Sequence, residues 1–299
     1  MAMSFQIDAK PSVPSFSQTL SLQIGSVCCA LKFEEPEIYE QLRKIYHSFL
    51  TEQPTDIIIE LVGTSRLNAK NISEALAETK FIHQDGNSFL TTTQIVSGQY
   101  DLTRQTIRLT GERSLVDPDL EFNHLNQLLA LAYYSACKVK YDGHLPAMLV
   151  HSCGVLRHGK VFLFAGPSDA GKTTIARLCG ERDGEVINDE ALLMSRPVAD
   201  GNGITVQGAP FISRLSPRRN VAAPLRCILL LKKNARTALR SINRAEAYLR
   251  FMRQIIAPAY IGQRDKRAIY SLMADFSDEV TRTVPVYELE FNLDGESLW

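Results

Sequence analysis

The segment 161–176, which reads VFLFAGPSDAGKTTIA, constrains the fold of this chain more than any other feature. It begins with a run of apolar residues, as expected of a buried β-strand, and a glycine-rich turn follows this run. The turn, residues 166–173, fits the pattern G-x-x-x-x-G-K-[ST], and apolar residues at helical spacing come after it. Strand, turn and helix in this order are the context in which the pattern forms a phosphate-binding loop.

The residue types in this turn suit the chemistry of phosphate binding. Gly166 and Gly171 permit backbone angles that are closed to other residues, so that several N–H groups can turn towards phosphate oxygens. The following helix adds its partly positive N-terminus. Lys172 supplies a mobile charge for the outer phosphates, and Thr173 a hydroxyl ligand for magnesium. The residues predicted to bind nucleotide phosphates are Gly166, Pro167, Ser168, Asp169, Ala170, Gly171, Lys172, Thr173 and Thr174.

Composition argues against several classes of protein. Among 299 residues, 33 lysines and arginines balance 33 aspartates and glutamates, so no global charge favours nucleic acid or membrane as a partner. No apolar run approaches the ~20 residues that span a bilayer, and residues 1–16 lack the apolar core of a signal peptide. The six cysteines include no C-x-x-C pair, which favours reduced thiols over a disulfide framework. We expect a soluble, cytoplasmic protein that binds neither nucleic acid nor membrane.

The first part of the chain, residues 1–118, is predicted to be a small α+β domain. Apolar and polar residues alternate over 19–24, which predicts a half-buried strand, and a helix is expected over 36–50. Further strands are expected over 56–62 and 88–111. No residues in this part have the spacing of a catalytic or metal-binding set. We therefore expect it to select the substrate or to serve as a structural unit.

The second part, residues 119–299, is predicted to be an α/β domain that contains the phosphate loop. An acidic, proline-containing loop over 113–119 marks the expected boundary, and a long helix is expected over 121–138. Strands are predicted at 148–156, 161–164, 185–187, 204–206, 227–231 and 284–291, and helices at 244–256 and 268–275.

Three more residues lie at chemically informative places. His151 falls in the apolar strand that precedes the loop strand, and Asp189 and Glu190 end the strand that follows the loop helix. A single histidine of this kind is often a hydrogen-bonded core residue, and two acids often merely flank a turn. Beside a phosphate loop, a carboxylate at a strand end can also accept a proton from an attacking hydroxyl or bind magnesium.

His151, the loop sequence GPSDAGKTT and the pair Asp189-Glu190 resemble the catalytic domain of the HPr kinase/phosphorylase family. In that family a histidine precedes the phosphate loop and an acidic pair follows the loop helix, at spacings similar to those in this chain. The segments VQGAPF and VPVYELEF also look like relatives of this family outside sugar regulation. The resemblance covers about half of the chain, from roughly Leu125 to the end.

The resemblance implies a P-loop kinase domain with the topology of phosphoenolpyruvate carboxykinase, and ATP with Mg²⁺ as cofactors. It gives Asp189 the role of base and a share in holding the metal, with Thr173 and Glu190 as further metal ligands. Lys172 and His151 complete the implied catalytic set, with His151 adjusting Asp189 or contacting phosphate. HPr kinases assemble into rings, so a homo-oligomer is among the states that the resemblance implies.

The chain also departs from true HPr kinases. Thr173-Thr174 stand where those enzymes have Ser-Glu, and Glu190 stands where they usually have an aspartate. The resemblance is therefore to a divergent relative, and such relatives phosphorylate a serine hydroxyl on free serine or on a biosynthetic peptide. We expect an ATP-dependent kinase whose acceptor is a hydroxyl, foremost that of serine, whether free, in a peptide or in a protein.

The sequence alone leaves two questions open. The alternative function is a nucleotide-binding regulatory or scaffold module that no longer transfers phosphate. The second question concerns a basic loop after the segment GAPF, from which one arginine could reach the transferred phosphate. Its arginines are Arg214, Arg218 and Arg219.

Overall fold

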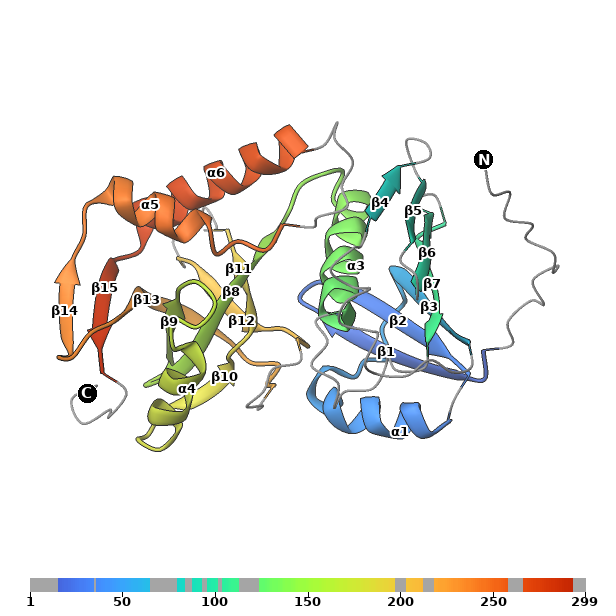
Figure 1. Cartoon of the computed structure of the whole chain (residues 1–299), viewed down its shortest axis with the longest axis horizontal. Helices are drawn as coiled ribbons and strands as arrows, with labels where there is room; N and C mark the ends of the chain where they lie inside the picture. Colours follow the sequence, from blue (N-terminus) through green and yellow to red (C-terminus); the bar gives the residue numbers. More distant parts are fainter. Residues whose placement is uncertain are drawn as a thin grey trace, which may run out of the picture.

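The chain is a mixed α/β protein with two mixed β-sheets, one of seven strands and one of eight. The computed structural model describes residues 16–34, 36–64, 80–83, 88–92, 96–101, 104–112, 124–196, 203–211, 218–257 and 266–292. Figure 1 shows the two sheets side by side, with helix α3 between them. The first sheet belongs to the part that was predicted as α+β, and the second carries the 166–174 loop.

The first sheet has the strand order β1-β2-β3-β7-β6-β5-β4. Its strands are β1 (Gln18–Ile24), β2 (Val27–Phe33), β3 (Ile57–Thr64), β4 (Lys80–His83), β5 (Ser88–Thr92), β6 (Val96–Asp101) and β7 (Thr106–Glu112). β3 runs parallel to both β2 and β7, and the other neighbours are antiparallel. In β1, Leu20, Leu22 and Ile24 are buried at alternate positions, which confirms the predicted half-buried strand.

Helix α1 (Pro36–Ile45) connects the parallel strands β2 and β3 and packs against β1. It is shorter than the helix predicted over 36–50, because the chain tightens after Ile45 into the 3₁₀ helix η1 (His47–Phe49). Tyr46, between the two helices, is fully buried. After η1, the backbone N–H of Thr51 donates a hydrogen bond to a β1 carbonyl, so this segment returns to the edge of the sheet.

Helix α3 (His124–Lys140) joins the two sheets into one apolar core. It packs against β2 and β3 of the first sheet. On the other side, the Tyr133 hydroxyl donates to the Ala147 carbonyl at 2.9 Å, and the Tyr134 hydroxyl to the Ile256 carbonyl at 2.7 Å. The boundary predicted at residue 118 lies outside the described residues and stays a prediction.

The second sheet has the order β10-β8-β11-β12-β13-β15-β14, with β9 paired to both β8 and β13. Its strands are β8 (Ala147–Arg157), β9 (Lys160–Ala165), β10 (Glu185–Asn188), β11 (Ala191–Ser195), β12 (Thr205–Gly208), β13 (Ala222–Lys233), β14 (Ala238–Ser241) and β15 (Val286–Phe291). β9, β13 and β15 are parallel, so their carboxyl ends meet at one edge, where β9 runs into the 166–174 loop.

Helices cover both faces of this sheet, as the alternation along β13 shows. Its Leu229 and Leu231 pack in the apolar cluster of Ile175, on α4, whereas Ile228 and Leu230 belong to the core that includes α5 and α6. These helices are α4 (Lys172–Gly180), α5 (Arg244–Met252) and α6 (Lys266–Thr283). Figure 1 shows α4 on one side of the sheet and the α5–α6 pair on the other. No helix in the described ranges is long and apolar enough to cross a membrane.

Candidate functional site

The 166–174 loop links the end of β9 to the start of α4, as predicted. Gly171 caps α4 with a φ of 103°, and a Cβ there would lie 2.5 Å from the Phe291 ring. Glycine is therefore required at this position for both conformation and space. Gly166 differs from the prediction, because its φ is not positive and its constraint is space: a Cβ would lie 2.8 Å from that of Ala170. The second left-handed residue of the loop is Asp169, with a φ of 61°.

Lys172 is folded into this loop and only 7% exposed. Its ammonium donates to the Gly166 carbonyl at 2.9 Å and to the Pro167 carbonyl at 3.1 Å. Burial lowers the pKa of this ammonium, and the nearby Glu190 carboxylate is the first of several groups that act in the opposite direction. The lysine thus holds a buried positive charge at the centre of the loop, without an ion pair to any described carboxylate. The loop's outer residues Pro167 and Ser168 are exposed, and Thr174 is half-buried.

Asp189 lies directly beside the start of α4. The Thr173 hydroxyl donates to its Oδ2 at 3.1 Å, so the last residues of the loop and the end of β10 are joined. Asp189 is 3% exposed, and within the described part of the chain its Oδ1 has no hydrogen-bond partner. A buried carboxylate oxygen without a partner is costly, which marks it as a group that a ligand would complete.

Asn188 holds the two acids in place, a role that the sequence analysis did not assign. Its Oδ1 accepts from the backbone N–H groups of Glu190 at 2.7 Å and Ala191 at 3.1 Å. Its Nδ2 donates to the carbonyls of Ala209 and Phe211. An asparagine at a strand end, followed by two acids, is a typical signal for such a turn.

His151 faces the second acid across the β8–β11 pairing. Its Nε2 lies 3.9 Å from Glu190 Oε1. Burial, assisted by the charge of Lys172, lowers the pKa of His151 to about 4, so the imidazole is neutral near pH 7. Burial also raises the pKa of Glu190, while Lys172 lowers it. His151, Asp189 and Glu190, which are distant from the loop in the sequence, therefore lie close to it in the fold. The charge of Lys172 lowers the pKa values of His151 and Glu190.

The side chains at the loop fit a magnesium ion held mainly by a ligand and water. Thr173, Asp189 and Glu190 offer only oxygen donors, which Mg²⁺ prefers, and Asp189 Oδ1 is unused. Across the described residues, no cluster of three or more histidines, cysteines, aspartates or glutamates could hold a metal by itself. Mg²⁺ commonly binds through one or two carboxylates plus substrate phosphates, so this donor set suits that mode.

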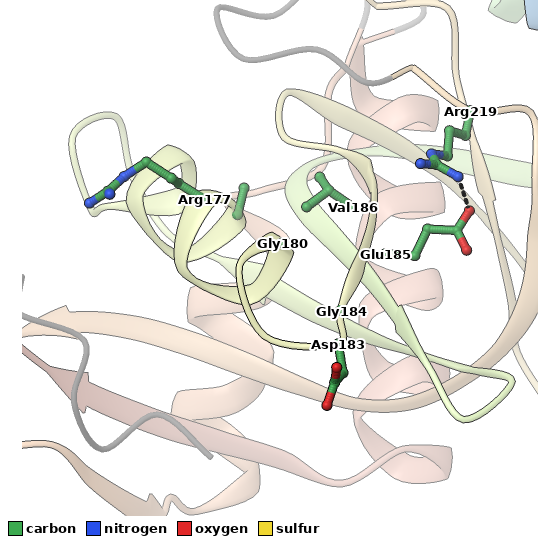
Figure 2. A pocket seen from close by; sticks show the side chains of 8 residues that line it. Arg177, Gly180, Asp183, Gly184, Glu185, Val186 and Arg219 are labelled. Carbon is green, nitrogen blue, oxygen red and sulfur yellow. Dashed lines mark hydrogen bonds and ion pairs between the residues drawn. The ribbon is translucent and has the colours of Figure 1, made fainter.

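A separate cavity of about 590 Å³ lies at the far end of α4. Residues between 176 and 186, together with Arg219, line it, and Figure 2 shows the ion pair of Arg219 with Glu185 at its side. The 166–174 loop lies at the opposite, N-terminal end of the helix, so this cavity is separate from the candidate site. Arg218 lies near Asp189 instead, and Arg214 falls outside the described residues.

Comparison with known proteins places the second part of the chain in a family. No curated protein matches the sequence. The family model described as "SynChlorMet cassette protein ScmC" matches residues 113–299, which include the second sheet and the whole candidate site. Because this match spans more than half of the chain, the chain belongs to the ScmC family.

Proposed function

We propose that this protein is an ATP-dependent kinase that transfers the γ-phosphate to a hydroxyl group, with serine as the favoured acceptor. The observation that carries the proposal is the buried ammonium of Lys172, held by loop carbonyls beside the Thr173–Asp189 hydrogen bond. A buried charge needs compensation, and the phosphates of a nucleotide would supply it. The left-handed Gly171 and the N-terminus of α4 support the same ligand.

The proposal extends to the fold. The order β9, loop, α4 and the parallel pairing of β9 with β13 support a P-loop kinase domain of the type implied by the resemblance to HPr kinases. All six cysteines are free and buried, which supports the cytoplasm as the protein's compartment. The first sheet, whose strands precede the family match, is proposed to select the acceptor.

Each residue near the loop has a chemical role in this proposal. Asp189 takes the proton of the acceptor hydroxyl through its unpaired Oδ1, while the hydroxyl oxygen bonds to the γ-phosphorus and the bond to the oxygen of ADP breaks. Lys172 binds the outer phosphates, and Thr173 and Glu190 would hold magnesium with Asp189. When bound, magnesium neutralises phosphate charge. His151, neutral near pH 7, contributes a hydrogen bond without adding a charge.

The test is transfer of labelled phosphate from ATP to serine and to serine-containing peptides, together with calorimetric titration of ATP. The wild-type protein should bind ATP and label an acceptor. Lys172→Ala should weaken ATP binding by about tenfold or more, because charge-assisted contacts to phosphate are lost. Failure of the wild type to bind ATP would refute the proposal. Binding without transfer to any acceptor would favour the regulatory or scaffold module, which Thr174 and Glu190 also support as departures from HPr kinases.

A further inference from the structure

The junction between the first sheet and the candidate site is fixed by two hydrogen bonds at neighbouring residues. The Ser48 hydroxyl, on η1, donates to the Arg218 carbonyl at 2.8 Å. The next backbone N–H, of Arg219, donates to the Ile187 carbonyl at 3.0 Å, and Ile187 precedes the Asn188 turn. The backbone of Arg218 is therefore held on one side by the N-terminal unit and on the other by the strand that carries the two acids.

The polar groups at this junction have unused hydrogen-bonding capacity. Tyr46 is 0% exposed, yet its hydroxyl has no partner in the described part of the protein, and the same holds for Asp189 Oδ1. The Arg218 guanidinium, which carries five donors, forms no ion pair with a described residue. Burial lowers the pKa of Arg218, and Tyr46 and Asp189 act in the opposite direction, so both lie within electrostatic range of it.

The neighbouring arginine has a different environment. Arg219 is exposed and forms an ion pair with Glu185 beside the cavity at the far end of α4, as Figure 2 shows. Its charge is therefore already matched by a carboxylate. Arg218, in contrast, is half-buried and forms no ion pair with a described residue, although Asp189 is within electrostatic range of it.

We propose that Arg218 binds the γ-phosphate of ATP and that the N-terminal unit positions it through Ser48. The proposal rests on the kinase function proposed above. A phosphate brought next to the Asp189 carboxylate is repelled, and a planar guanidinium that binds two phosphate oxygens offsets this repulsion. Lys172 is fixed to the loop through two carbonyls, whereas the Arg218 carbonyl accepts a hydrogen bond from Ser48 of the N-terminal unit. The first sheet would thereby influence phosphate binding as well as the choice of acceptor.

The test compares calorimetric binding of Mg-ATP and Mg-ADP in three proteins: wild type, Arg218→Ala and the matched control Arg219→Ala. Arg218→Ala should weaken Mg-ATP binding by about tenfold or more and Mg-ADP binding by less than about twofold, because only ATP has the γ-phosphate. Arg219→Ala should change neither. If Arg218→Ala fails to fold, Arg218→Lys replaces it, and a smaller loss that is still confined to ATP is expected.

The outcomes separate this inference from the kinase proposal. If the wild type binds neither nucleotide, both the kinase proposal and the proposed role of Arg218 are refuted. If the wild type binds both, but the variant loses ATP and ADP equally or loses neither, Arg218 does not contact the γ-phosphate and the inference alone is overturned. An equal ATP-specific loss in Arg219→Ala would also overturn it, since that side chain points to the other end of α4.

Discussion

Two acidic pairs associated with the second sheet, Asp189-Glu190 and Glu288 with Glu290, have different surroundings. Asp189 and Glu290 are each 3% exposed, so burial alone does not distinguish these two acids. Glu190 is half-buried, whereas Glu288, on β15 with Glu290, is buried. The carboxylates of β15 are surrounded by cations. At the end of β10, the Thr173 hydroxyl donates to Asp189 and the Asn188 side chain accepts from the backbone of Glu190. No described lysine or arginine forms an ion pair with either acid, although Lys172 and Arg218 are within electrostatic range.

The β15 pair is fully partnered. Glu290 accepts from Lys232 at 3.0 Å, from Asn234 at 2.9 Å and from Arg240 at 3.0 Å. Glu288 accepts from Arg250 at 2.7 Å and from Lys232 at 3.3 Å. Hydrogen bonds from these partners lower the pKa of Glu290, chiefly that from Lys232, and they lower the pKa of Glu288 against the effect of burial. This pair links β13, β14, β15 and α5 and is structural.

The pair Asp189-Glu190 has fewer direct partners among the described residues than the β15 pair. Among the described residues, Asp189 accepts one hydrogen bond, from Thr173, and burial is the main cause of the raised pKa of Glu190. Stable proteins usually satisfy buried charges, and exceptions concentrate where a ligand completes the site. The difference between the pairs therefore indicates which acids serve the fold and which serve the proposed chemistry.

Exchange of Asp189 for asparagine is expected to give the largest effect on this comparison. Asp189→Asn keeps the shape and removes the proposed base, so the proposed kinase turnover should fall at least about a hundredfold, or ~2.7 kcal/mol of barrier. Its melting temperature should change little, because asparagine keeps an acceptor for the Thr173 hydroxyl. Steady-state kinetics and thermal unfolding measure the two quantities. Retained turnover would show that the base lies elsewhere, with His151 as the first residue to examine.

A smaller loss is expected when the turn that holds the acids is disturbed. Asn188→Ala leaves the backbone groups of Glu190 and Ala191 without their side-chain acceptor, which should cost roughly 1–3 kcal/mol of stability. Turnover should fall as well, because Asp189 is no longer held at a fixed distance from the loop. Asn188→Asp keeps an acceptor for both backbone N–H groups but loses the donations to the Ala209 and Phe211 carbonyls, so its comparison with Asn188→Ala separates the two sets of hydrogen bonds. A variant with lost stability and unchanged turnover per folded molecule would show that the turn does not position the base.

Substitution in the β15 pair should lower the stability of the fold and leave turnover nearly unchanged. Glu290→Gln makes the same change from carboxylate to amide as Asp189→Asn, but it leaves Lys232 and Arg240 without a buried anion. We expect a lower melting temperature and turnover within about twofold of wild type once corrected for the folded fraction. A hundredfold loss of turnover in a folded Glu290→Gln protein would remove the distinction between a structural and a functional pair.

Local patterns in the sequence predicted much of the second sheet and its loop. The apolar run before the glycine turn predicted β9, and the helical spacing after the turn predicted α4. Both could be predicted because they depend on residues that are close together in the sequence. The acids at the end of β10 were also identified, and Asp189 does lie against Thr173. The strand β14, which reads ALRS and is mostly exposed, was missed because it has no apolar alternation.

Features that depend on distant parts of the chain were not predictable. Glu290 and Arg240 are 50 residues apart, and Ser48 and Arg218 are 170 apart, so no periodicity links them. The packing of α3 between the two sheets has the same origin, since a hydrophobic helix does not specify its partner. The sequence identified the chemical groups, and the topology determined which of them meet.

The pH dependence of stability gives the smallest expected effect, and the two pairs should differ in sign. The pKa of Glu190 is raised above its ordinary value of 4.5, so the fold disfavours its charged form. Near pH 7, Glu190→Gln should therefore be more stable than wild type. The gap should close as the pH falls through the raised pKa, because the wild-type carboxyl then becomes protonated.

For Glu290 the sign is reversed. Its pKa is lowered below 4.5, so its charge stabilises the fold at all pH values above the ordinary pKa. Glu290→Gln should be less stable than wild type near pH 7, and this gap should close only as the pH falls through the lowered pKa. Urea unfolding of wild type, Glu190→Gln and Glu290→Gln at several pH values measures both differences. Differences of the same sign for both variants would mean that the acids near the loop are compensated in the fold, and the contrast between the pairs would then rest on geometry alone.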